Sequence, residues 1–233
     1  MKIAADTLDE LQEAIAAHSL NGWYVAEHKR QSDGTHTATL VRERIGGWIT
    51  TYTGKQFWPL DPRPEDICIE DIAHSLALQC RYNGHTQMFY SVAEHCVHLS
   101  RYVAPHRALW ALLHDASETY LCDIPSPIKP MLEGYAELES NITSVINKKF
   151  GLIGDIPIEV DQADKRIVAD EMHALCTDSS WTDGFEPLGI EIECWDFTTA
   201  EHEFMNRFRE IFRNDCWDEG CPHFGSPHSH TTP

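Results

Sequence analysis

The chain has 233 residues, 42% of them hydrophobic and 24% charged, which suits one compact domain with an appendage. Its 37 acidic and 18 basic residues give a formal net charge of −19, which argues against coating a nucleic-acid polymer or an anionic membrane, because those partners need a basic surface. It lacks a stretch of ~18 apolar residues and the apolar core of a signal peptide, and its eight cysteines are scattered, so we expect a soluble cytoplasmic protein with reduced thiols.

Residues 1–46 predict a small accessory module built from a helix and a β-hairpin. Residues 6–18 begin with a capping candidate and repeat apolar residues on one helical face. Two β-rich runs, 22–26 and 35–41, follow and are separated by a glycine-containing turn. The module shows no convergent polar cluster, so a cap or an oligomer contact is favoured over a ligand site.

Residues 47–215 predict the main domain. The arm at 50–64 contains three prolines and is therefore extended rather than helical. Helical periodicity then predicts helices over residues 67–79, 90–103, 106–117, 135–150, 157–175 and 199–212. An irregular loop is expected over 178–197 and a flexible tail over 216–233. We therefore predict an all-α fold class, a helical bundle that carries the small N-terminal module as an appendage.

The adjacent pair His114-Asp115 offers one imidazole nitrogen and one carboxylate oxygen to a divalent ion. On a helix, neighbouring side chains project about 100° apart, which is wide enough to flank an ion and too narrow to complete its shell. Other segments must supply the remaining ligands.

Two segments each offer a pair of candidates for those ligands. His95 and His98 lie three residues apart, as do Asp161 and Asp164, so each pair shares a helical face and spacing alone does not choose between its members. One residue from each pair would complete a site of two histidines and two carboxylates.

Glu118 lies four residues after His114 and three after Asp115. On one continuous helix it would share their face, near the ion without having to bind it. Glu118 is thus the candidate catalytic residue, positioning a water that the ion acidifies and handling protons, for a gain of roughly a hundredfold or more.

Four motifs in this order resemble the HD-domain metal-dependent phosphohydrolases: Ser-Val-Ala-Glu-His95, His114-Asp115-Ala-Ser-Glu118, Asp123-Ile-Pro-Ser-Pro-Ile-Lys129 and Gln-Ala-Asp164. The resemblance covers roughly residues 48–213. The run from 114 to 129 is similar to bacterial 5'-deoxynucleotidases, and the stretch from 71 to 84 resembles phage nucleotide phosphohydrolases, including dATP triphosphohydrolases.

The resemblance implies an HD-domain helical bundle and a ligand set. It selects His95 over His98, and Asp164 over Asp161, as partners of His114-Asp115 for one divalent metal ion, which could be Co, Mn, Zn or Mg. It also gives Glu118 the catalytic role.

The resemblance further implies the substrate contacts Arg81, Tyr82, Asp123 and Lys129. Arg81 would hold the phosphate with its fork of donors, although an arginine after a helix also serves the helix dipole. Tyr82 could stack on a base or pack on the bundle, Asp123 could meet substrate or stabilise its Pro-rich turn, and Lys129 could meet a phosphate oxygen or water.

These features predict a hydrolase of deoxynucleoside 5'-phosphates that controls a nucleotide pool in a bacterial or phage-infected cytoplasm. A monophosphate would give nucleoside and phosphate, and a triphosphate would release its triphosphate as a unit. The resembling proteins are commonly homo-oligomers, so a homo-oligomer is expected. The alternatives are a non-catalytic nucleotide sensor, against which Glu118 argues, and a phosphodiesterase acting on cyclic or linear dinucleotides.

Two other patterns are weak evidence for a further ligand site. Cys216, Cys221 and His223 lack the Cys-x2-Cys spacing of a structural zinc site. The pair Gly46-Gly47 is not followed by a Lys-Ser/Thr signature, which excludes a Walker-type ATPase.

Overall fold

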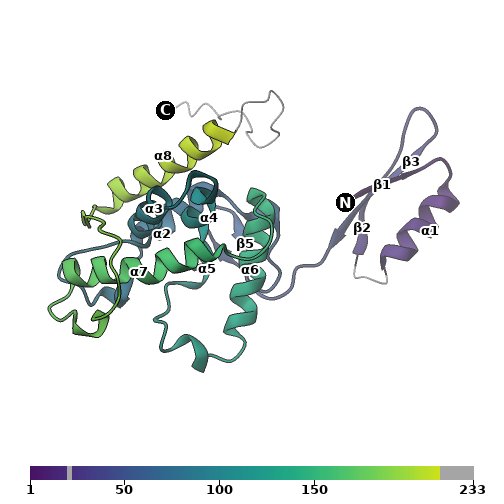
Figure 1. Ribbon diagram of the computed structural model, residues 1–233. Helices are drawn as coiled ribbons and strands as arrows, with labels where there is room; N and C mark the ends of the chain where they lie inside the picture. Colours follow the sequence, from purple (N-terminus) through teal and green to yellow (C-terminus); the bar gives the residue numbers. More distant parts are fainter. Residues whose placement is uncertain (20–22, 216–233) are drawn as a thin grey trace, which may run out of the picture. The chain divides into compact units, whose positions relative to one another are not determined.

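The structure is a computed structural model that describes residues 1–19 and 23–215 (Figure 1). The chain divides into two compact units, one from Met1 to Gly47 and the other from Trp48 onward. The tail at 216–233, with Cys216, Cys221 and His223, lies outside the described residues.

The first unit is a three-stranded antiparallel sheet with one helix. It comprises β1 (Lys2–Ala5), α1 (Leu8–Ser19), β2 (Trp23–Arg30) and β3 (His36–Arg42), and the strand order is β1-β3-β2. Leu11 of α1 packs with Ala38 and Leu40 of β3, because alternate residues of β3 face the helix. The turn between β2 and β3 contains Gly34 at a φ of 95°, a conformation that glycine adopts without strain.

The all-α prediction is wrong. The chain is mixed α/β, with the three-stranded sheet of the first unit and a two-stranded sheet in the second, formed by β4 (Ile49–Thr50) and β5 (Gln56–Phe57). β1 was missed because four residues are too few to show alternation, and its partner β3 is distant in sequence, Lys2 pairing with Thr39. β4 overlaps the start of the arm that was expected to be extended over 50–64, β5 lies within it, and the two strands pair with each other.

The second unit is built mainly from helices. In chain order these are α2 (Ile69–Leu78), α3 (Val92–Tyr102), α4 (Ala108–Leu113), α5 (Glu118–Leu121), α6 (Tyr135–Phe150), α7 (Ile158–Leu175) and α8 (Phe197–Asp215). Short 3-10 helices join them at Pro64–Asp66, Arg81–Gly84, Pro105–Arg107, Lys129–Met131 and Ser180–Thr182. None of the described helices is long and apolar enough to span a membrane.

Helix α3 is the centre of this unit. Its neighbours include α2, α4, α7 and α8, and the residues from Val92 to Ser100 are all buried (Figure 1). Ser91 caps the helix by accepting a hydrogen bond from the Glu94 N–H at 3.0 Å. A helix that is covered on every side can hold polar side chains in fixed positions inside the unit, and His95 is one of them.

The helix predicted over residues 106–117 is interrupted. α4 ends at Leu113, a turn follows, and α5 begins at Glu118. Hydrogen bonds between residues three apart, from the Ala116 N–H to the Leu113 carbonyl and from the Glu118 N–H to the Asp115 carbonyl, replace the α-helical bonds between residues four apart. Glu118 therefore reaches the His114-Asp115 pair across a tight turn rather than along one continuous helix.

The irregular loop between α7 and α8 is held by two carboxylates. Asp170 accepts hydrogen bonds from the backbone N–H groups of residues 188, 189 and 190. The buried carboxylate of Glu94 accepts those of residues 193, 194 and 195. These charge-assisted hydrogen bonds give partners to backbone N–H groups of a loop that lacks the regular hydrogen bonds of a helix or a sheet.

Candidate metal centre

Four side chains from three helical segments bring one donor atom each to the same point. His95 Nε2 lies 3.1 Å from Asp164 Oδ1, 3.3 Å from His114 Nε2 and 3.6 Å from Asp115 Oδ2. His114 Nε2 lies 3.2 Å from Asp115 Oδ2 and 3.7 Å from Asp164 Oδ1. The structure thus brings together the four residues that were predicted as ligands.

Both imidazoles are oriented by a hydrogen bond on the far side of the ring. His95 Nδ1 lies 2.6 Å from Oε1 of Glu171, and His114 Nδ1 lies 2.8 Å from the carbonyl oxygen of Ala111. A carboxylate and a carbonyl only accept, so Nδ1 of each ring donates its hydrogen. In the neutral ring the lone pair of each Nε2 then faces the other three atoms, and a hydrogen bond on the far nitrogen is what metal-binding histidines commonly have.

This donor set fits a divalent cation. Two imidazole nitrogens and two carboxylate oxygens converge in a partly buried place, where the two negative charges repel unless a positive charge lies between them. Without an ion a proton meets the same demand, because burial disfavours a charged ring, yet Asp115 raises the pKa of His114 well above its ordinary value. His95, His114 and Asp164 form a group that could hold a metal ion.

A second group that could hold a metal ion consists of Cys96, His114 and Asp115. Its donors fit less well. Burial raises the pKa of the Cys96 thiol to about 11, so the thiolate form is disfavoured. His114 would also have to turn from the Ala111 carbonyl to use its Nδ1. We therefore place the centre on the Nε2 side of His114.

Glu171 holds several side chains of the centre in place. Besides His95, its carboxylate accepts hydrogen bonds from the hydroxyls of Tyr82 and Tyr90 and from Arg81, whose Nη2 lies 3.3 Å away. Burial opposes its charge, but Arg81 and His95 hold the pKa of Glu171 at about 2. Sequence reasoning missed this residue, although it follows Asp164 by seven positions and so shares its face of α7.

Glu118 lies at the edge of the centre with one oxygen free. Its Oε1 is 3.7 Å from Lys129 Nζ, while its buried Oε2 has no hydrogen-bond partner among the described residues. Burial, and next the charges of Asp115 and Asp123, raise the pKa of Glu118 to about 9. In the protein without a bound ion, this carboxyl therefore carries a proton at neutral pH.

The four predicted substrate contacts lie in different settings. Arg81 is at the centre, with Nη1 3.5 Å from Asp115 Oδ2, whereas the hydroxyl of Tyr82 is committed to Glu171. The Asp123 backbone N–H donates a hydrogen bond to the Gln79 side chain, and burial raises the pKa of the Asp123 carboxyl. Lys129 bonds Glu139 at 3.0 Å.

The two residues that were set aside as ligands lie elsewhere. His98 is buried, with Nε2 3.3 Å from Glu94 Oε1 and its ring beside Trp195. Asp161 pairs with Lys165 at 2.7 Å, one helical turn along α7. Neither is among the residues grouped as able to hold a metal ion in the described part of the chain.

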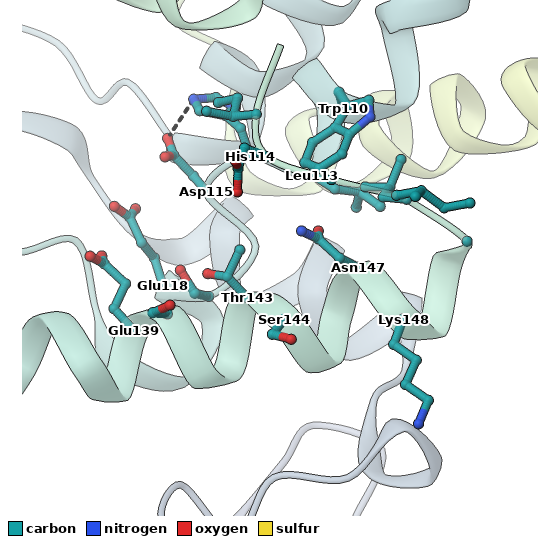
Figure 2. A pocket seen from close by; sticks show the side chains of 18 of the residues that line it. Trp110, Leu113, His114, Asp115, Glu118, Glu139, Thr143, Ser144, Asn147 and Lys148 are labelled. Atoms are coloured by element: carbon teal, nitrogen blue, oxygen red, sulfur yellow. Dashed lines mark ion pairs between the residues drawn. The ribbon is translucent and has the colours of Figure 1, made fainter.

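A cavity of about 990 Å³ opens beside the centre, between α4 and the turn after it on one side and α6 on the other (Figure 2). His114, Asp115 and Glu118 line one end of it. The residues Gly151–Ile156, which join α6 to α7, line it as well. Its volume is in the range of pockets for small organic ligands.

No family model matches the chain. It is 42% identical over 131 residues to "Uncharacterized protein YfdR" of Escherichia coli strain K12, a match that covers 56% of this chain and 74% of that protein. It is 39% identical over 128 residues to "Uncharacterized protein RCAP_rcc00048" of Rhodobacter capsulatus, which covers 51% of this chain and 65% of that protein. On its likeness to the first of these, the chain belongs to the same protein family as YfdR.

Proposed function

We propose that the protein is a metal-dependent phosphohydrolase that acts on deoxynucleoside 5'-phosphates. The observation that carries this proposal is the convergence of His95, His114, Asp115 and Asp164 on one point, 3.1 to 3.7 Å apart where measured, with Glu118 and Arg81 at its edge. The resemblance of the surrounding motifs to HD-domain phosphohydrolases gives the reaction and the substrate class.

A divalent ion bound at these four atoms would acidify a water and polarise a phosphoryl oxygen. Its identity, Co, Mn, Zn or Mg, is not fixed by nitrogen and oxygen donors, since such sites accept several ions. Because both Nε2 lone pairs are already directed by Glu171 and Ala111, His95 and His114 bind without reorienting.

Glu118 handles the proton in this proposal. Its buried Oε2 has no hydrogen-bond partner among the described residues, and its raised pKa lets the carboxyl hold a proton that it can give to the leaving oxygen. A cation at the centre would offset the charge of Asp115 and so lower that pKa, although the burial that contributes most to it would remain.

Arg81 holds the phosphate in this proposal. Glu171 fixes one of its terminal nitrogens, and the other is 3.5 Å from Asp115, so the guanidinium lies beside the place where a phosphate would meet the four donor atoms. Its Nε has no hydrogen-bond partner among the described residues, although it is buried. An anionic oxygen is a suitable partner for such a donor.

The test is a panel of deoxynucleoside mono- and triphosphates, each offered with Mn, Co, Zn or Mg, with the products separated by chromatography. We expect metal-dependent release of phosphate from a monophosphate, or of triphosphate from a triphosphate. A dinucleotide substrate is the control for the phosphodiesterase alternative. If none of the deoxynucleotides is hydrolysed with any of the four metals, the proposed function is wrong.

A further inference from the structure

The wall of the cavity that faces the metal centre is formed by α6, and its chemistry differs from that of the centre. Thr143 and Asn147 are half-buried on this wall, four residues apart and therefore on one helical face. Figure 2 shows both side chains pointing from α6 toward the segment that carries Leu113 and His114. Neither side chain has a hydrogen-bond partner in the described part of the chain, so the hydroxyl and the amide are available to a ligand.

The opposite wall is apolar. Trp110 and Leu113 line the cavity from α4, and Leu152 and Ile156 line it from the segment after α6. Trp110 precedes His114 by four residues, and His114 still has helical dihedral angles, so the two residues are about one helical turn apart, a rise of ~6 Å along the axis. A furanose ring can span that separation.

The charge of the cavity selects what it can hold. Its lining includes four acidic residues, Asp115, Glu118, Glu139 and Asp155, and one basic residue, Lys148. Lys129, at the centre's edge, is already paired with Glu139. The cavity is therefore ill suited to a polyanion, whereas its neutral middle suits an uncharged group that stacks and forms hydrogen bonds.

We propose that this cavity is the nucleoside subsite, in which Trp110 supports the base and Thr143 and Asn147 form hydrogen bonds with the base or sugar. The identity of the occupant rests on the proposed function, since a nucleoside is what remains of the substrate once its phosphate lies at the metal centre. An amide in this position pairs well with the edge of a base, because it donates and accepts at once.

The proposal can be tested by binding, without turnover. The full chain is dialysed against each of the four deoxynucleosides, which lack a phosphate, and the bound fraction is measured. We expect at least one deoxynucleoside to bind, and Asn147→Ala to raise its Kd about tenfold, the effect of losing one or two neutral hydrogen bonds. Asn141→Ala is the matched control, because Asn141 is exposed on the same helix and is not part of the lining.

A second variant tests the apolar wall. Trp110→Leu should raise the same Kd roughly tenfold or more, since base stacking on an aromatic ring contributes about 1–3 kcal/mol. Trp110 also packs against a cluster with Leu99 and Val160, so the fold of this variant is checked by circular dichroism. If Trp110→Leu does not fold, the deoxynucleoside affinity of Asn147→Ala alone tests the subsite.

The outcomes separate this inference from the proposed function. If no deoxynucleoside binds, or if Asn147→Ala binds as tightly as the unaltered chain, the subsite is wrong even where nucleotides are hydrolysed. If deoxynucleosides bind in a manner that depends on Asn147 while no nucleotide is hydrolysed, the subsite stands and the proposed reaction falls.

Discussion

The metal centre and the α6 wall lie at the same cavity, but the polar groups of the centre are held by hydrogen bonds within the protein, whereas those of the wall are not. In the centre, His95 and Arg81 are held by Glu171, which also accepts bonds from the hydroxyls of Tyr82 and Tyr90. On the wall, Thr143 and Asn147 have no hydrogen-bond partner among the described residues. The difference teaches which part must be rigid, because an ion demands fixed donor atoms, whereas a nucleoside can be met by side chains that water solvates until it arrives.

Glu118→Gln, which changes the centre and not the wall, should have the largest effect on activity. The amide keeps the shape of the side chain but cannot deliver a proton, so we expect kcat for the deoxynucleotide to fall about 10²- to 10⁴-fold. Metal content should stay unchanged, because Glu118 is not one of the four donors, and deoxynucleoside affinity should change little, because Glu118 lines the end of the cavity away from Asn147. Steady-state kinetics beside elemental analysis would check this, and a variant that retains full kcat would remove Glu118 from the reaction.

Removal of the ion should destabilise the unit that contains the centre. A ligand at about 100 times its Kd stabilises a folded protein by about 2.7 kcal/mol, so a chelator should lower Tm by several degrees. Adding back the metal should restore Tm. Calorimetry with and without chelator measures the shift, and an unchanged Tm in a protein shown to have lost its metal would contradict the view that the four acceptors need a cation.

Glu171→Gln tests whether the far side of His95 matters to the ion. The amide can still accept from His95, but it loses the negative charge, so we expect metal affinity to fall about 10- to 100-fold. Titration with a competing fluorescent chelator gives the affinity. The matched control is Glu139→Gln, since Glu139 lines the same cavity and bonds Lys129 rather than a metal ligand. Equal metal affinities in the two variants would show that Glu171 serves folding alone.

Thr143→Val should have the smallest effect. Valine keeps the volume and removes the hydroxyl, so we expect KM for the deoxynucleotide to rise about threefold to tenfold while kcat is unchanged. Hydrolysis of p-nitrophenyl phosphate, which has no nucleoside, should not change. A loss that is equal for both substrates would place the effect of Thr143 in the metal centre and not on the wall.

The sequence located the donors of the centre better than it located their surroundings. The His114-Asp115 pair and two further segments could be found from residue type and helical spacing, but the choice of His95 and Asp164 over their neighbours came from the resemblance. The structure brings the selected residues together and pairs Asp161 with Lys165 instead. Local patterns thus indicate which residues can bind, while the fold decides which of them meet.

What the sequence did not predict depends on contacts between distant segments. Glu171 meets His95 across 76 positions, and the short strand β1 pairs with β3, so neither interaction leaves a local period. The all-α prediction failed for that reason. The free hydroxyl and amide of the α6 wall were missed as well, because exposed and cavity-lining polar residues of a helix look alike in sequence.

The central claim is that one ion is held by four atoms, one each from His95, His114, Asp115 and Asp164. The most direct test is elemental analysis of the dialysed full chain beside Asp164→Ala and its control Asp161→Ala, which lies on the same helix. We predict about one divalent ion per chain in the unaltered protein and in Asp161→Ala, and a loss of bound metal in Asp164→Ala. Metal retained in Asp164→Ala, or absent from the unaltered protein after incubation with Mn, Co, Zn or Mg, would contradict the account.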